Sequence, residues 1–198
     1  MSLTIQTKTY AGLSDEELVQ LIFSGGDRLP KDYSDEVIFR GQRIAPLLAG
    51  VIQDRKNWFR DDAGWWSAVH ATLLLGAIGG ESAVPALVDA MFCAAEADND
   101  WVNEQMASIW GAVGPGALEE LKEIALDSGL DCYLRERAMG GMAAIAQRHP
   151  ECDEEIFRFI GGIAADEEDD PDARTWAGHV LLDFQRKEHE ELLLSLAR

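Results

Sequence analysis

Basic side chains are missing from the middle of this chain. Its 198 residues contain 36 Asp plus Glu but only 17 Lys plus Arg, giving a formal net charge of −19, and no Lys or Arg occurs between Arg60 and Lys122. Proteins that bind nucleic acid need clustered cations that neutralise phosphates and release counterions. The charge pattern therefore excludes nucleic acid as the main partner, whereas an anionic surface can steer a basic partner.

Long apolar runs are lacking as well. The most apolar stretches, residues 73–78 and 83–95, are interrupted by Gly, Glu and Asp well short of the ~20 residues that a bilayer span needs. The first residues, 1–5, carry neither the cationic flank nor the apolar run of a secretory signal. We therefore expect a cytoplasmic protein without a membrane helix.

Motifs of catalysis and metal binding are also absent. The sequence has no Gly-x-Ser-x-Gly, no phosphate-binding glycine loop with its Lys and no His-Glu-x-x-His. The three cysteines, Cys93, Cys132 and Cys152, lack close pairing, which favours reduced thiols over disulfides. His149 precedes Cys152 but a fourth zinc ligand is missing, and the acidic run 166–172 lacks the glycine of a calcium loop. We expect no metal, no cofactor and no catalytic residue, so the chain is not predicted to be an enzyme.

What the sequence does contain is an internal repeat. The stretch 79–88, with its two glycines and a proline before an apolar helix-like segment, aligns with 113–121. Similar segments begin at 149, 186 and 44. The spacing of about 34 to 39 residues is typical of a helical-hairpin repeat.

The repeat predicts an all-α fold, an α-α superhelix of about five helical hairpins in a single domain, 1–198. Residues 1–13 are expected to be a tail, 14–60 an atypical first unit and 61–198 four regular hairpins. The four hairpins pair the predicted helices 65–77 with 82–95, 101–113 with 116–127, 133–147 with 153–165, and 172–185 with 188–197.

The atypical first unit carries its own helix signals. A capping box at residues 14–17 precedes a predicted helix over 15–23. A second predicted helix, 35–54, is interrupted by Pro46.

Two parts of the repeat resemble a known family. The segment 69–79 with 83–88, and the segment from Arg135 to Ala146, are similar to HEAT-type repeats, which place an Arg before a small residue, then Leu and Gly, then a short loop into a second helix. The chain also resembles uncharacterised bacterial HEAT-like proteins in which a Trp precedes a His-Ala-x-x-Leu-Leu-Gly segment, although it lacks the Cys-rich zinc tail of some of them. The resemblance implies an α-solenoid that binds other proteins and supplies no reaction.

His70 is the most suggestive single residue of the best-formed repeat. It follows Trp66 by one helical turn. A functional interpretation makes it a hydrogen-bonding anchor on a groove wall, or a general base near Asp61 or Asp62. The structural alternative is a histidine that bonds a loop carbonyl between helices.

The six tryptophans divide into two groups. Trp66, Trp110 and Trp176 share helical stripes with Val, Leu and Ile, which predicts core positions. The others lie off these stripes, and exposed tryptophans are enriched among the residues that dominate binding energy. The predicted surface anchors are Trp58, Trp65 and Trp101.

These features favour a non-catalytic scaffold that holds a basic or amphipathic protein segment on an acidic surface. Asp98, Asp100 and Glu104 are the candidate acidic contacts beside Trp101. The alternative is an acidic inhibitor, an immunity-type protein or a nucleic-acid mimic that blocks a cationic site on an enzyme. A HEAT-like lyase is a third hypothesis, for which Trp66, His70 and Asp62 only loosely provide the required pocket and positioned acid. We expect a monomer or a weak homo-oligomer.

Overall fold

Helices make up the regular structure of the protein. A computed structural model describes residues 10–197, which form twelve α-helices joined by short 3-10 helices and contain no β-strand. The prediction of an all-α fold is confirmed. Of the predicted tail, residues 1–9 lie outside the described residues, and Tyr10–Gly12 form a 3-10 turn.

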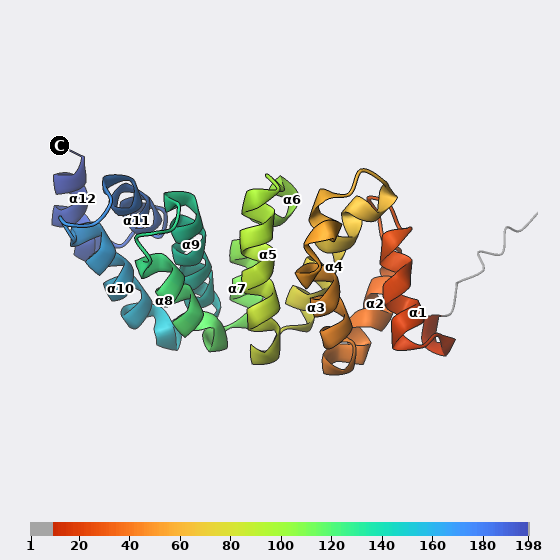
Figure 1. Ribbon diagram of the computed structural model, residues 1–198. Helices are drawn as coiled ribbons and strands as arrows, with labels where there is room; N and C mark the ends of the chain where they lie inside the picture. The colour runs from red at the N-terminus through yellow and green to blue at the C-terminus, as the bar shows by residue number, and fades with distance from the viewer. Residues whose placement is uncertain (1–9, 198) are drawn as a thin grey trace, which may run out of the picture. The chain divides into compact units, whose positions relative to one another are not determined.

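The helices, which are labelled in Figure 1, belong to two compact units. The first unit comprises residues 10–78 and 85–102, and the second comprises 79–84 and 103–197. Helices mainly in the first unit are α1 (Asp15–Gln20), α2 (Lys31–Arg40), α3 (Ala45–Gln53), α4 (Trp66–Ile78), α5 (Val84–Glu96) and α6 (Asp100–Asn103). Helices in the second unit are α7 (Met106–Val113), α8 (Leu118–Leu126), α9 (Cys132–Arg148), α10 (Asp153–Ala165), α11 (Pro171–Asp183) and α12 (Glu190–Leu196).

Side-chain caps mark the starts of three α-helices, α1, α9 and α11. The predicted capping box is confirmed, because Ser14 accepts a hydrogen bond from the Glu17 backbone N–H and the Glu17 side chain accepts one from Ser14 N–H. The side chains of Asp131 and Asp170 cap α9 and α11 in the same manner. Each cap satisfies backbone donors that the first helical turn leaves unpaired.

Two predicted helices differ from the observed ones. The predicted break at Pro46 is wrong: the chain breaks at Gly41, whose φ of 55° is left-handed, and Pro46 lies in the first turn of α3. The predicted helix 101–113 is divided between α6 and α7. Val102 is buried in the first unit and Met106 in the second. Glu104 and Gln105 between them are good helix formers, so packing of the two flanking residues, not helical propensity, accounts for the break.

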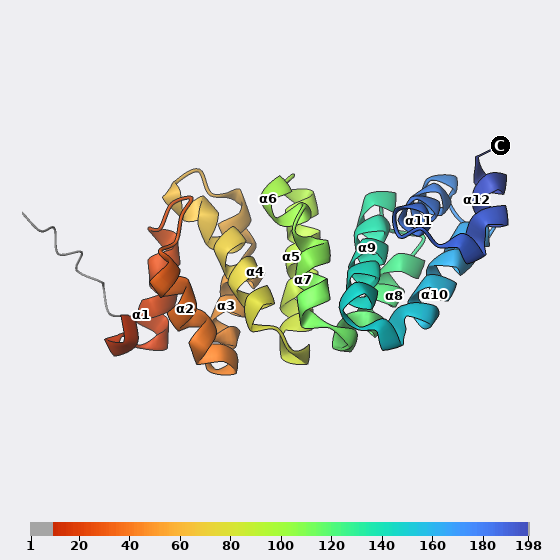
Figure 2. The ribbon, with the colours of Figure 1, turned by 180° about the vertical axis from the view of Figure 1, so that it is seen from behind.

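Two layers of helices form the second unit. Helices α7, α9 and α11 lie side by side, with α8 and α10 on the opposite side, as the two views of Figures 1 and 2 show. Helix α9 is central, because it packs against α7, α8, α10 and α11. Helix α11 in turn packs against both α9 and α10, so it fills the groove between them.

The crossing of α7 and α9 depends on a glycine. A Cβ atom added at Gly141 would lie 2.6 Å from Cδ1 of the buried Trp110 side chain, whereas one at the neighbouring Gly140 would meet only Glu136 Oε1 at 3.7 Å. A contact of 2.6 Å forces the indole or the helix to move. Gly141 therefore permits the close approach of the two helices.

We expect opposite effects from two adjacent Gly→Ala substitutions. Gly141→Ala should destabilise the protein by about 1–3 kcal/mol, because it overpacks the contact with Trp110. Gly140→Ala should stabilise it by about 0.5–1 kcal/mol, because alanine is the better helix former and the space is open. Urea unfolding followed by circular dichroism measures both, and equal effects of the same sign would contradict the close-approach role.

Candidate partner-binding site

Three tryptophans of the first unit meet at one place. Trp66 at the start of α4 lies between Trp65 and Trp101, with ring-centroid distances of 4.9 and 5.2 Å and edge-on geometry in both contacts. Trp101 in α6 is 61% exposed, and the other two are partly exposed. Edge-to-face contacts of this kind fix the orientation of aromatic rings. We call Trp65, Trp66 and Trp101 the aromatic patch.

His70 contacts this patch through Trp66. Its ring stacks on Trp66 at 6.0 Å, and its Nε2 lies 2.8 Å from the carbonyl oxygen of Gly26. Because a carbonyl only accepts hydrogen bonds, Nε2 carries the proton and donates. Burial lowers the pKa of His70, against the opposing effects of the Gly26 carbonyl and the charge of Asp27, so the imidazole is neutral at pH 7. His70 thus ties the loop at Gly26 to α4, which is the structural role considered for it.

Of the two candidate carboxylate partners of His70, Asp62 is engaged in other hydrogen bonds. Asp62 accepts two hydrogen bonds from the Arg60 guanidinium, at 2.8 and 2.7 Å, and one from the Gly64 N–H at 2.9 Å. The Arg60 hydrogen bonds hold the pKa of Asp62 below its usual range. Asp62 therefore fixes the turn that leads into α4, while Asp61 is exposed to solvent.

One predicted surface anchor is wrong. Trp58 is only 2% exposed and donates from Nε1 to the carbonyl oxygen of Ile52 at 2.8 Å. The 3-10 helix Arg55–Phe59 folds back over the end of α3, where Asn57 also bonds the Val51 carbonyl, so the indole enters the core with its N–H satisfied.

The predicted core group is corrected in part. Trp110 is fully buried as predicted, but Trp66 and Trp176 are only partly buried. In the second unit, Trp176 contacts the rings of Tyr133 and His179 at 5.6 and 5.3 Å. The helical stripes of Trp66 and Trp176 predict one packed face of each indole, but an indole is so large that part of it stays exposed to solvent.

Acidic side chains in the segment without Lys or Arg all face solvent. The ten exposed residues are Asp61, Asp62, Glu81, Asp89, Glu96, Asp98, Asp100, Glu104, Glu119 and Glu120. Asp98 and Asp100 lie on either side of the buried Asn99 in the turn that leads into Trp101, and Asp98 has a left-handed φ of 49°. Glu104 belongs to the second unit. Two of the three candidate acidic contacts, Asp98 and Asp100, thus belong to the same unit as the aromatic patch, and Asp100 directly precedes Trp101 in α6.

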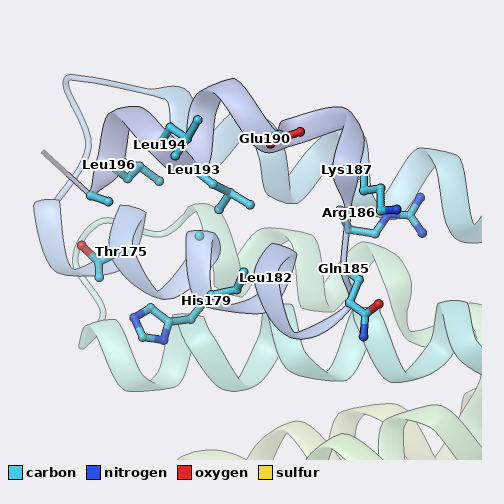
Figure 3. Close-up of a pocket in the computed structure, with 12 residues that line it drawn as sticks. Thr175, His179, Leu182, Gln185, Arg186, Lys187, Glu190, Leu193, Leu194 and Leu196 are labelled. Atoms are coloured by element: carbon cyan, nitrogen blue, oxygen red, sulfur yellow. The ribbon is translucent and has the colours of Figure 1, made fainter.

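A groove in the second unit was not predicted from the sequence. It has a volume of about 890 Å³ and lies between α11 and α12 (Figure 3). Figure 3 shows Leu193 of α12 between the two helices, and Gln185, Arg186 and Lys187 together at one end. The signal in the sequence is the run of three leucines at 192–194, which exceeds what one buried face of a helix needs. We call this the α11–α12 groove.

Membrane-spanning and metal-binding features are missing from residues 10–197. No helix in this range is both long and apolar enough to cross a bilayer, and nowhere in it do three or more His, Cys, Asp or Glu side chains gather as metal ligands. The three cysteines are free, and burial raises the pKa of each thiol.

Comparison of the chain with protein family models, with curated protein sequences and with solved structures gives no match.

Proposed function

We propose that the chain is a non-catalytic protein-binding scaffold whose aromatic patch anchors a basic or amphipathic segment of a partner protein. The observation that carries the proposal is the exposed Trp101, held edge-on against Trp66. A large side chain fixed before binding loses little conformational entropy when a partner packs against it. Tryptophans in such positions contribute heavily to binding energy.

The charges around the patch indicate the chemistry of the partner. Asp98 and Asp100 are exposed, and neither forms an ion pair with another described residue. Their charges are therefore available to a cationic side chain of a partner. Net charge of this sign raises the association rate of a basic protein and disfavours an acidic one.

The repeated hairpins support the same proposal. Stacked helical hairpins that resemble HEAT repeats present long surfaces to other proteins. In this proposal the scaffold acts in the cytoplasm as a monomer or weak homo-oligomer, and it carries out no reaction.

We expect Trp101→Ala to weaken binding of a Lys/Leu amphipathic helical peptide by about ten- to a hundredfold, because it removes the anchor. The matched control is Phe39→Ala, which deletes an even more exposed aromatic ring, on α2 and outside the patch. Titration calorimetry of both variants gives the affinities. Equal losses in the two variants would mean that the patch is not the binding site.

The exposed carboxylates of residues 61–121 also favour the second candidate, an acidic inhibitor or nucleic-acid mimic. The two functions are distinguished by whether binding depends on the Trp101 indole, on the exposed carboxylates, or on both. Asp98→Asn with Asp100→Asn and Glu104→Gln should slow association in both cases, and raising the salt from about 0.05 to about 0.5 M should do the same. If a partner captured from cell extract binds the Trp101→Ala variant as well as the wild type but binds the variant with the three neutralised carboxylates more weakly, the inhibitor is favoured over the scaffold.

A further inference from the structure

Helix α11 is built on the same plan as α9, 39 residues earlier in the chain. Asp131 and Asp170 cap the two helices through their side chains. Four residues after each cap, Arg135 and Arg174 donate from Nε to the backbone carbonyl ten residues earlier, at 2.8 and 3.4 Å. The two arginines therefore occupy equivalent positions in their helices and make the same Nε hydrogen bond.

The two arginines differ in their remaining hydrogen bonds. Arg135 also donates to both carboxylate oxygens of Asp169, at 2.8 and 2.5 Å. Asp169 comes from the loop that precedes α11, which is the helix that fills the groove between α9 and α10. Arg174 forms no ion pair with any described carboxylate, although its charge acts on Asp169. It is partly buried, and beyond its bond to the Ala164 carbonyl its guanidinium can donate to a carboxylate.

The residues one and two helical turns after each arginine also occupy equivalent positions in α9 and α11. Met139 and Ala143 of α9 are fully buried. Their equivalents 39 residues later are Gly178 and Leu182, which line the α11–α12 groove, and Leu182 is 61% exposed. The 3-10 turns that lead into α10 and α12 correspond as well. The α11–α12 groove is thus the next equivalent of the groove that α11 fills, and no described segment covers it.

We infer that the α11–α12 groove binds an amphipathic helix of a partner protein, with an acidic residue in the loop before that helix paired to Arg174. The apolar face of the bound helix packs on Leu182 and Leu193, as α11 packs between α9 and α10. Lys187 at one end of the groove is exposed and has no ion pair with the described residues, so it can pair with a carboxylate of the bound helix, while Glu190 also lines the groove. This surface belongs to the second unit and is independent of the aromatic patch.

The chain itself supplies the probe. A peptide of residues 166–185, stapled to hold it helical, contains the loop aspartate and the helix that fill the preceding groove. We expect saturable binding of the fluorescently labelled peptide to the full chain. Leu182→Glu in the protein should weaken it at least about tenfold, and so should Asp169→Asn in the peptide.

Arg174→Gln provides the specific readout of the charge pair. The loss from Asp169→Asn in the peptide should largely disappear in the Arg174→Gln protein, because the pair is already broken. The matched control is Leu126→Glu, which places the same charge on another exposed leucine of the second unit and should leave binding unchanged.

Three results would overturn the inference. The first is the absence of saturable binding, and the second is equal weakening by Leu182→Glu and Leu126→Glu. The third is concentration-dependent self-association in sedimentation that Leu182→Glu abolishes, which would assign the groove to a second copy of the chain.

Discussion

Arg135→Ala is expected to destabilise the protein by about 3–5 kcal/mol, because it leaves a buried carboxylate without its cation. The Arg135 side chain is 1% exposed and that of Asp169 is 11% exposed. The substitution also deprives the Ala125 carbonyl of its side-chain donor at 2.8 Å. Urea unfolding followed by circular dichroism measures the loss.

A surface ion pair in the same unit is the matched control. Arg158 is 71% exposed and pairs with Glu154 one helical turn away. Arg158→Ala should change the free energy of unfolding by less than about 0.5 kcal/mol, since solvent screens this pair. Equal effects of the two Arg→Ala changes would show that Arg135 is not a structural link.

The pH dependence of stability gives an independent check on Arg135. Hydrogen bonds from Arg135 lower the pKa of Asp169 from its ordinary value of 3.8. A lowered pKa contributes stability that is complete above the unfolded-state value and is lost as the pH falls through the folded-state value. The wild-type protein should lose this contribution below pH 3.8, and Arg135→Ala should lack it at every pH.

Trp110→Ala is expected to destabilise the protein by about 3–5 kcal/mol, because it opens a cavity where α7 crosses α9. Trp110 is fully buried, and its ring lies against the backbone of Gly141. Its Nε1 has no hydrogen-bond partner among the described residues. Trp110→Phe should therefore lose less than half as much, since it keeps most of the ring and removes an unpaired donor.

Trp101→Ala is the counterpart that separates stability from binding. Trp101 is 61% exposed, so its removal should change the free energy of unfolding by less than about 1 kcal/mol. Thermal unfolding of the Trp101 and Trp110 variants in parallel checks both values. A large loss from Trp101→Ala would place this residue in the core and remove the main support for the proposed scaffold.

Local features of the sequence predicted the elements of the fold well. Helix α10 has the predicted bounds, Asp153–Ala165, and the capping box at Ser14 is as predicted. Both depend on neighbours three or four residues apart, because an N-cap and an apolar stripe are complete within one or two helical turns. The sequence predicts the break at Pro46 instead of Gly41, because it does not show which residue adopts a left-handed φ.

Candidate site residues were less predictable because exposure is a property of the whole fold. Trp58 and Trp101 both lie off the helical stripes, yet the first is buried and the second is exposed. The difference arises from the 3-10 helix at Arg55–Phe59, which folds Trp58 over the end of α3. No spacing within the sequence shows where that turn leads.

The sequence by itself determined the all-α class, the helical repeat and the acidic middle of the chain. Only the tertiary structure paired Arg135 with Asp169, brought Trp66 to Trp101 and left the groove between α11 and α12 uncovered. The first group follows from short-range periodicity and composition. The second joins residues about 34 or more positions apart, or depends on which helix faces meet, and packing alone decides those contacts.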